Sequence, residues 1–334
     1  MKLARPFIRL PLDFDAARLA QEAAQLASAA WRAHPLGLKG NSAVALISRG
    51  GGDNDEFGGR MTATPHLGGC PYHRQVMASF NEVLARSRLM KLDAGCEVQN
   101  HVDFNYHWYT RVRIHIPVIT NPAVIFHCGD EKVHMAAGEC WIFDNWRRHN
   151  VINGSGQDRI HLVIDLSGSS RFWKMVRQAL KAGQGNGSDR FEVLPYEPDK
   201  RVDILTENYN ISPVMAPGEI DALVAELVRE FADHPGNDPV LVERYRLILT
   251  DFASDWRETW HRYGMDRQGL PHYRRLLERV KNELHPERRA LLISANDIGV
   301  NPVIVQRILR AALAPEVREQ FFDDSGTDFK SVPT

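Results

Sequence analysis

A run of chemically active side chains occupies residues 101–115, which read HVDFNYHWYTRVRIH. Residues i and i+2 of a β-strand point to the same face, so the imidazole of His101 and the carboxylate of Asp103 would converge on one point. Such a pair could chelate a metal ion. The alternative is that both are merely polar residues that lie two apart on a strand.

A third side chain of the same kind is His149, inside FDNWRRHNVIN and at the start of another predicted strand. Two histidines and one carboxylate on three corners of an octahedron form the facial triad of non-haem iron(II) oxygenases, which leaves three coordination positions open. A jelly roll can bring such strand ends together. His101, Asp103 and His149 are therefore candidate iron ligands.

Cationic side chains accompany these ligands. Arg159 begins the apolar run RIHLVID, and its planar guanidinium could anchor a dicarboxylate co-substrate. The alternative partner for Arg159 is the carboxylate of Asp165. Strand alternation puts Arg111, Arg113 and His115 on one face, where they either line an anion-binding cavity or face solvent. We favour the cavity.

The segment that must position these residues, 89–165, reads as a series of short strands. The runs RVRIHIPVIT, AVIFHCG, ECWIFD and RIHLVIDL are rich in β-branched and aromatic residues, and turn-forming clusters separate them. Even spacing of short strands predicts an all-β sandwich or jelly roll.

Helices and loops are expected on both sides of this β segment. Upstream we expect a strand over 7–12, a helix capped by Asp13 or Asp15 that runs to about Trp31, a glycine-rich surface loop over 37–69, and a helix over 72–88. Downstream, helical periodicity recurs in EIDALVAELVREF, PVLVERYRLILTDFASDW and YRRLLERVKNEL. The polar segment 182–190 marks the boundary. This organisation predicts an α+β protein with a jelly-roll domain over 1–180 and a helical C-terminal domain over 190–325.

The segment 290–313 allows two interpretations. The pattern of a helix-turn-helix is present in NDIGVNPVIVQRILR, with a short helix, a glycine at the turn and a second helix that carries the cationic Arg307 and Arg310. Against DNA binding, Val303, Ile304, Ile308 and Leu309 form an apolar stripe. We favour helices that pack on the β domain, close one side of its active site or form a homodimer contact.

The composition limits the classes of partner. With 41 basic against 42 acidic residues in 334, the formal net charge is -1, and no general field attracts nucleic acid or an acidic membrane. The four cysteines have no Cys-x-x-Cys spacing, which argues against a structural zinc site and a disulfide framework. The N-terminus has no signal-peptide pattern, and no stretch approaches about 18 apolar residues. We expect a cytoplasmic protein without a membrane span.

The stretch from about residue 88 to 172 resembles the aspartyl/asparaginyl β-hydroxylase family, to which the bacterial proline hydroxylases are related. The resemblance is carried by LMKLDAGCEVQNHVD, RVRIHIPVIT, AAGECWIFDNWRRHNVIN and DRIHLVIDLSGS. The occurrence of these motifs in this order is much more specific for the family than any one motif alone. It implies a double-stranded β-helix, a cupin-like jelly roll, and an enzyme that uses iron(II), 2-oxoglutarate and O2.

The resemblance also implies roles for individual residues. The implied iron ligands are His101, Asp103 and His149. The implied contacts to carboxylates are Arg159, which holds the distal carboxylate of 2-oxoglutarate, and Arg113, His115 and His127, which match less specific positions of the family. Asp103 favours hydroxylation over halogenation, because a halogenating site needs the carboxylate position vacant.

Two features depart from the family pattern. Met90 stands where the animal peptide hydroxylases place a serine near the oxoglutarate, and Asp103 is present where those enzymes lack a carboxylate. The segment between His101 and Arg113 is also expanded. Its residues Tyr106, His107 and Trp108 are candidates for substrate contact, although we expect at least one of them to pack in the core.

Three hypotheses for the function follow. The first is an iron(II)- and 2-oxoglutarate-dependent dioxygenase that hydroxylates an unactivated C–H bond of an amino acid, a peptide side chain or a similar carboxylate-bearing substrate. The second is a cupin-like metal-binding protein of other activity, in which Arg159 would be dispensable. The third is a transcription regulator that senses a ligand and binds DNA through 290–313. Under the first, the partner is a small molecule or peptide, and neither nucleic acid nor membrane.

Overall fold

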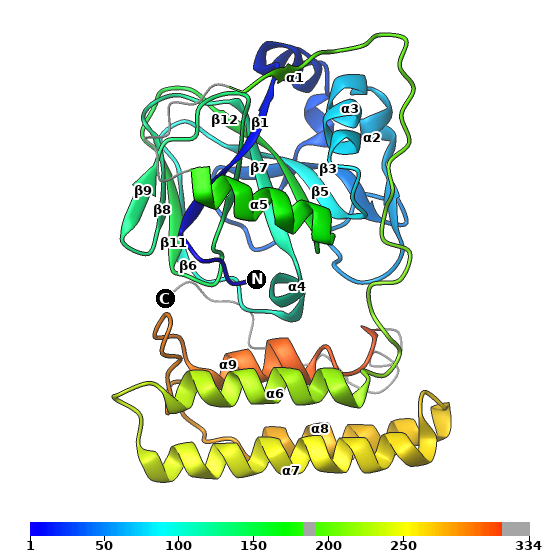
Figure 1. Cartoon of the computed structure of the whole chain (residues 1–334), viewed down its shortest axis with the longest axis vertical. Coiled ribbons are helices and arrows are strands. Elements are labelled where there is room, and N and C mark those ends of the chain that lie inside the picture. The colour runs from blue at the N-terminus through cyan, green and yellow to red at the C-terminus, as the bar shows by residue number, and fades with distance from the viewer. Residues whose placement is uncertain (183–190, 316–334) are drawn as a thin grey trace. The chain divides into compact units, whose positions relative to one another are not determined.

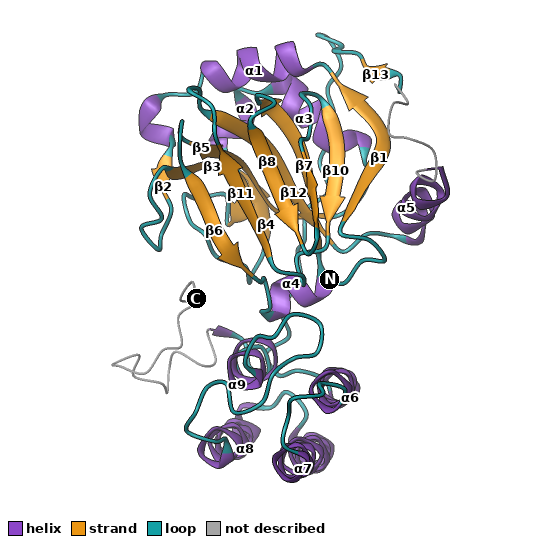
Figure 2. Ribbon diagram, turned by 90° about the vertical axis from the view of Figure 1, so that its left-hand side faces the viewer, coloured by secondary structure: helices purple, strands orange, loops and turns teal. Residues whose placement is uncertain are grey.

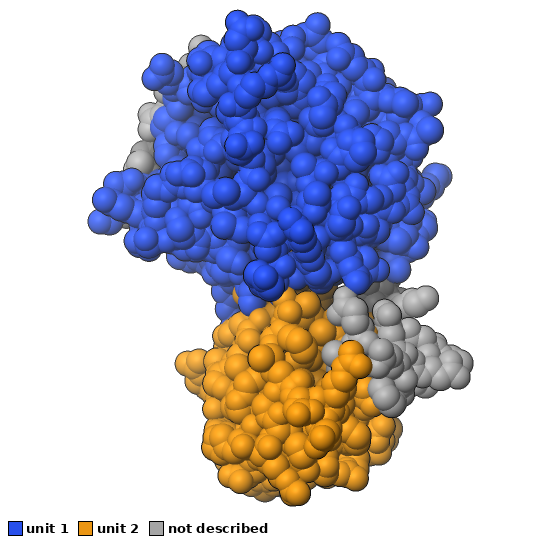
Figure 3. Space-filling model, turned by 90° about the vertical axis from the view of Figure 1, so that its right-hand side faces the viewer, with its two compact units in different colours: residues 1–101, 110–210, 333–334 blue, residues 102–109, 211–332 orange. Residues whose placement is uncertain are grey.

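The computed structural model describes residues 1–182 and 191–315, and these residues form two compact units. The first contains Met1–His101 and Thr110–Asn210, and the second contains Val102–Tyr109 and the chain from Ile211 onward. Figure 3 colours the two units separately. The polar segment expected to mark the domain boundary lies mostly outside the described residues.

Two sheets build the first unit (Figures 1 and 2). In the described part of the chain, the larger sheet has the order β13-β1-β10-β7-β12-β5-β3-β2, with β4 paired to β3, and the smaller sheet has the order β6-β11-β8-β9. The strands of the larger sheet are β1 (Phe7–Phe14), β2 (Arg32–Ala33), β3 (Asn41–Arg49), β4 (Met61–Ala63), β5 (Leu84–Leu92), β7 (Val112–Ile119), β10 (Glu139–Phe143), β12 (Arg159–Leu166) and β13 (Val193–Leu194). Those of the smaller sheet are β6 (Glu97–His101), β8 (Val124–Cys128), β9 (Glu131–Val133) and β11 (His149–Asn153).

The strands β5 to β12 have the connectivity of a double-stranded β-helix. Along the chain they pass back and forth between the sheets, so that β5, β12, β7 and β10 are neighbours in the larger sheet and β6, β11, β8 and β9 in the smaller one. All of these neighbours pair antiparallel. The predicted jelly-roll fold is confirmed.

Strand β12 shows how the sequence separates a structural face from a chemical face. All eight of its residues are buried. The even-numbered residues from Ile160 to Leu166 are apolar and join the main core, to which Leu19 of one helix and Val76 of another also belong. The odd-numbered residues point the other way and include Arg159, His161 and Asp165. The larger sheet therefore packs helices on one face and presents polar groups on its inner face.

The helices of the first unit are short and serve the main core. They are α1 (Ala16–Ala24), α2 (Pro65–Gly68), α3 (Pro71–Ser79) and α5 (Ser170–Ala182), with the 3-10 turn η1 (Ser28–Ala30). Asp15 caps α1 as predicted, because its side chain accepts a hydrogen bond from the Arg18 amide. This helix ends at Ala24 and not near Trp31.

Two other expectations for the N-terminal part were wrong. The glycine-rich stretch 37–69 is not one surface loop, since β3 crosses it with Val44, Leu46 and Ile47 fully buried. The helix expected over 72–88 ends at Ser79, and β5 starts at Leu84. The apolar residues of 72–88 fitted a helical spacing, but the second part of this range belongs to β5, which pairs with a strand on each side.

The second unit is helical, as predicted. Its elements are most of α4 (Tyr106–Thr110), α6 (Pro217–Ala232), α7 (Pro239–Tyr263), η2 (Arg267–Gly269), α8 (Leu270–Glu283), α9 (Val300–Val303) and the π-helical turn η3 (Ile304–Leu309). Aromatic residues fill its interior: Trp256 lies 4.5 Å from Tyr273 between ring centroids. Among the described residues, no helix has both the length and the hydropathy to cross a bilayer.

The stripe predicted within 290–313 is buried. Val303, Ile304 and Ile308 have no exposed surface, and Leu309 is 8% exposed. Arg307 is also buried, and its Nε donates a hydrogen bond to the carbonyl oxygen of Phe104 at 3.3 Å. A recognition helix needs its cations on the surface. The burial of Arg307 therefore argues against the DNA-binding interpretation of this segment.

Candidate metal centre

The three predicted metal ligands come together. One ligand atom each of His101, Asp103 and His149 lies within 4.8 Å of the others. His101 ends β6 and His149 begins β11, and the two residues are partners across the smaller sheet, with ring centroids 4.2 Å apart. The sequence spacing predicts that His101 and Asp103 share one strand face, but Asp103 lies beyond the end of β6. Asp103 is close to His101 because only one residue separates them along the chain.

Backbone carbonyls orient both imidazoles. Nδ1 of His101 lies 2.7 Å from the carbonyl oxygen of Gln99, and Nδ1 of His149 lies 2.9 Å from that of Arg147. A carbonyl oxygen only accepts hydrogen bonds, so Nδ1 of each ring carries a proton, and Nε2 is the nitrogen that could bind a metal ion. Such partners hold metal-binding histidines in one tautomer and one orientation.

A turn anchored by Asp144 sets the position of His149. The Asp144 carboxylate is buried and accepts the Trp146 amide at 3.1 Å and Arg147 Nε at 3.2 Å. The Asp144 carbonyl oxygen also accepts the Arg147 amide at 3.1 Å. This turn follows β10 directly and presents the Arg147 carbonyl oxygen that holds His149.

Arg159 stands in the inner face of the larger sheet without a carboxylate partner among the described residues. It is 4% exposed, its Nε has no hydrogen-bond partner there, and its guanidinium lies 4.9 Å from the Phe126 ring. Burial lowers its pKa to about 9. The alternative partner, Asp165, instead forms a two-bond pair with Arg113 at 2.6 and 2.8 Å. A buried cation of this kind requires an anion.

Two neutral histidines lie beside Arg159. His115 and His161 are 6% and 0% exposed, and both nitrogens of each ring lack hydrogen-bond partners among the described residues. Burial lowers both pKa values well below the usual range, and the positive charge of Arg159 adds to this effect. The His161 ring stacks on Phe126 at 5.2 Å. The sequence analysis did not select His161, although its alternation with Arg159 placed it on the same face.

Other predicted side chains lie elsewhere or are already paired. Arg111 is buried and makes two hydrogen bonds to Glu207 at 2.8 and 2.9 Å. His127 lies between two residues of the inner core of the jelly roll, Phe126 and Cys128, so it points to the opposite face of β8. The structure does not bring it to Arg159. His107 and Trp108 are buried and pack against each other at 4.9 Å, as expected for at least one residue of this segment.

A second group of potential ligands has a structural role. Glu22, Cys70 and His73 also have ligand atoms within 4.8 Å of one another. The Glu22 carboxylate accepts the amides of Tyr72 and His73 at the start of α3, so it caps that helix. Burial raises the pKa of the Cys70 thiol to about 12, which keeps it protonated. A protonated thiol is a poor metal ligand.

Comparison with known proteins agrees with the site. Residues 13–168 match the family model described as aspartyl/asparaginyl beta-hydroxylase. This part of the chain, slightly less than half of its length, is similar to that family. The resemblance inferred from the sequence motifs is thereby confirmed, and the matched region includes β2 to β12 and the three candidate ligand positions. No curated protein sequence matches the chain.

Solved structures with detectable similarity include two oxygenases. One is an oxidoreductase of the 2OG-Fe(II) oxygenase family from Burkholderia pseudomallei, with 16% identity, a TM-score of 0.34, and coverage of 48% of this chain and 83% of that chain. Another is a prolyl hydroxylase from Trichoplax adhaerens in complex with a hypoxia inducible factor peptide, with 10% identity, a TM-score of 0.37, and coverage of 52% and 87%. The fold assignment itself rests on the strand order described above.

The residues present fit iron and 2-oxoglutarate. Two neutral imidazoles and a carboxylate are suitable donors for iron(II). The buried guanidinium of Arg159 and the unpaired nitrogens of His115 and His161 are groups that a dicarboxylate could satisfy. In a hydroxylase-family domain, this donor set makes the centre at His101, Asp103 and His149 the candidate active site.

Proposed function

We propose that this protein is an iron(II)- and 2-oxoglutarate-dependent dioxygenase that hydroxylates an unactivated C–H bond of an amino acid, a peptide side chain or a similar carboxylate-bearing substrate. The proposal depends most on one observation, the buried guanidinium of Arg159 without a carboxylate partner in the described chain. A family member that only bound a metal would not need it. The proposed oxygenase domain is residues 1–180 and its helical companion residues 190–325. The compact units of the structure differ from these bounds, since 191–210 belong to the first unit and Val102–Tyr109 to the second.

The proposed roles follow from donor chemistry. His101, Asp103 and His149 would hold iron through two Nε2 atoms and one carboxylate oxygen. Arg159 would bind the distal carboxylate of 2-oxoglutarate with two N–H groups of its fork. The bound iron and 2-oxoglutarate would supply the oxidising chemistry, in which O2 is consumed and succinate and CO2 are released.

The surroundings of Arg159 would strengthen this binding. Phe126 and Phe143 lie next to His115, with ring centroids 5.8 and 5.0 Å from its own. These rings exclude water, and in a dry site a charged hydrogen bond is stronger than in solvent. His115 stays neutral beside Arg159, so it can donate one N–H to a carboxylate without adding a positive charge.

The experiment that tests the proposal measures the co-substrate and the product together. The protein is incubated with iron(II), ascorbate and 2-oxoglutarate, alone and with a panel of amino acids and short peptides. Succinate release, and a mass gain of one oxygen atom in one member of the panel, are expected. If iron binds without any succinate release across the panel, the cupin-like alternative is favoured.

A further inference from the structure

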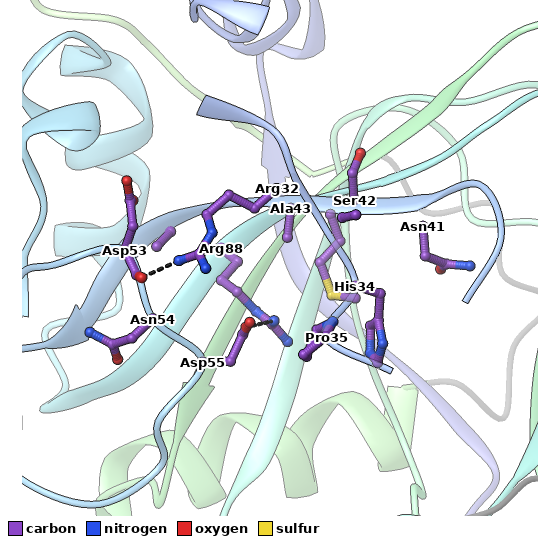
Figure 4. A pocket seen from close by; sticks show the side chains of 13 residues that line it. Arg32, His34, Pro35, Asn41, Ser42, Ala43, Asp53, Asn54, Asp55 and Arg88 are labelled. Atoms are coloured by element: carbon purple, nitrogen blue, oxygen red, sulfur yellow. Dashed lines mark hydrogen bonds and ion pairs between the residues drawn. The ribbon is translucent and has the colours of Figure 1, made fainter. Parts of the chain in front are cut away.

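A second guanidinium site lies on the inner face of the larger sheet, on β5. Arg86 and Arg88 are 4% and 6% exposed. Both contact Asp55: Arg88 Nη1 donates to its carboxylate at 2.6 Å, and Arg86 Nη1 donates to its carbonyl oxygen at 2.9 Å. Arg86 Nε also lies 4.0 Å from the carboxylate of Asp165. The Asp55 carboxylate is also 3.9 Å from Arg86 Nη1. Figure 4 shows the side chain of Asp55 directed at Arg88.

The contacts with Asp55 use only some of the N–H donors of Arg86 and Arg88. A carboxylate bound by arginine often receives two parallel N–H bonds, but Asp55 receives one from Arg88. Nε of Arg88 and Nε of Arg86 are buried without a hydrogen-bond partner among the described residues. A buried N–H donor that makes no hydrogen bond lowers the stability of the folded protein. The site can therefore accept a carboxylate better placed than that of Asp55.

A ligand could displace the Asp55 carboxylate from Arg88. The Asp55 side chain is 36% exposed, whereas that of Arg88 is 8% exposed. It belongs to a loop between β3 and β4 that starts at two glycines with positive φ, Gly50 at 63° and Gly51 at 74°. The carboxylate thus comes from an external loop to a cation fixed in the sheet. Displacing Asp55 needs a movement of that loop and no rearrangement of β5.

The space beneath this loop is too small for a substrate while Asp55 is in place. A cavity of about 20 Å³ is lined by Arg88, Met90 and Ala43 of the sheet and by His34, Asp53 and Asp55. This volume holds about one water molecule, whereas small-molecule sites measure roughly 300 Å³ or more. A ligand of Arg88 would have to displace the loop.

The cavity shares a lining residue with the inner sheet face that carries His161 and Arg113. Met90 lines it, contacts Arg113 Nη1 through its sulfur at 3.8 Å, and is the strand partner of His161. Burial lowers the pKa of His34, and the positive charge of Arg88 lowers it further, so His34 faces the same guanidinium.

We propose that Arg88 binds a carboxylate of the substrate and that Asp55 occupies this position until the substrate displaces it. The substrate class is thereby narrowed to molecules with a free carboxylate at some distance from the bond that is hydroxylated. The identification of the ligand as substrate rests on the proposed function. The carboxylate preference of Arg88 and the competition by Asp55 do not.

Acetate serves as the minimal carboxylate probe. The full-length protein is saturated with Ni²⁺ and 2-oxoglutarate, so that the Arg159 site is filled, and acetate binding is measured by ligand-observed NMR. Asp55→Asn removes the competing charge and should bind acetate roughly tenfold more tightly, since one charged hydrogen bond is freed. Asp55→Glu keeps the charge and should behave as the wild type.

Glu56→Gln is the matched control. Glu56 lies on the same loop, is exposed, and is not among the residues that line the cavity. Its substitution should leave acetate binding unchanged. In the Asp55→Asn background, Arg88→Gln should abolish the gain, and Arg88→Lys should keep part of it, with circular dichroism reporting whether each variant folds.

A structural ion pair predicts the opposite pattern. If Asp55→Asn binds acetate no better than the wild type, or if the gain survives Arg88→Gln in a folded protein, the inference is overturned. Succinate release with iron(II), ascorbate, 2-oxoglutarate and the panel of amino acids and short peptides is measured in parallel. Its absence would contradict the proposed function, while the acetate result would still decide the role of Arg88.

Discussion

At the scale of single residues, the arginines of the inner sheet face differ in whether the protein provides a carboxylate partner for them. Arg111 and Arg113 each have a two-bond carboxylate partner, in Glu207 and Asp165. Arg159 has none among the described residues. The same residue type at one face thus serves structure in two positions and, in our proposal, a ligand in the third.

Arg159→Gln tests this distinction. We expect the KM for 2-oxoglutarate to rise roughly 10- to 100-fold, because one or two charged hydrogen bonds are lost. Metal affinity should not change, since Arg159 is not among the proposed ligands. Lys91→Gln is the control, because Lys91 lies on the adjacent strand and pairs with Asp93 and Asp158 near the surface. An unchanged KM in Arg159→Gln would contradict the assignment.

His161 predicts a pH dependence of stability. Burial, with Arg159, lowers its pKa in the folded protein, so below about pH 6.5 the unfolded chain binds a proton that the folded chain does not. The free energy of unfolding should therefore fall on acidification through this window, by up to about 1.4 kcal/mol per pH unit from this residue. Urea unfolding at pH 7 and pH 5 measures it. His161→Gln should reduce the difference between the two pH values, and an unchanged difference would argue against this role.

At the scale of elements, the segment that carries Asp103 belongs to the helical unit. Tyr109 donates a hydrogen bond to Glu226 of α6 at 2.9 Å, and Tyr106 donates one to Glu219 of the same helix. Arg307 binds the Phe104 carbonyl oxygen and lies 5.1 Å from the Tyr109 ring. The helices thus fix the backbone on one side of a proposed iron ligand.

Arg307→Leu should disturb this segment. It removes a buried hydrogen bond and the cation over Tyr109, and we expect Ni²⁺ affinity to fall about tenfold, comparable to the loss of a group that orients a ligand. Isothermal titration calorimetry measures the affinity. Arg246→Gln, an exposed arginine of α7 that pairs with Glu243, is the control. Equal affinity in both variants would show that the helical unit does not position Asp103.

The elements also show which features could be predicted from the sequence. The runs around β7, β8, β10 and β12 are bounded by turn residues, and local pattern alone was sufficient to predict them. Strand β3 was missed because glycines on both sides of NSAVALISR dominated the composition. The fold class and the candidate metal ligands followed from ordered motifs. The pairing of Arg88 with Asp55 joins positions far apart in the sequence, and no local pattern records it.

At the scale of the whole molecule, the first unit holds buried polar groups that have no hydrogen-bond partner within residues 1–182 and 191–315. These include nitrogens of His115, His161, Arg88 and Arg159. Buried polar groups without partners lower the stability of a protein. Ligands that satisfy them bind the folded chain and not the unfolded one.

Thermal unfolding should therefore respond to ligands in combination. With Ni²⁺ present, 2-oxoglutarate at about 100 times its Kd should add about 2.7 kcal/mol to the free energy of unfolding and raise the Tm by several degrees. Glutaramide, which lacks both carboxylates, is the control and should have no effect. An equal rise with both compounds would indicate binding that does not involve Arg159.

The most direct test of the central claim is anaerobic titration of the protein with iron(II), followed by 2-oxoglutarate. We predict one iron per chain, a metal-to-ligand charge-transfer absorption band when 2-oxoglutarate is added, and loss of both in a folded His149→Ala variant. Arg159→Gln should bind the iron but need far more 2-oxoglutarate to develop the band. Iron binding that survives His149→Ala, or the absence of any band in the wild type, would contradict the account.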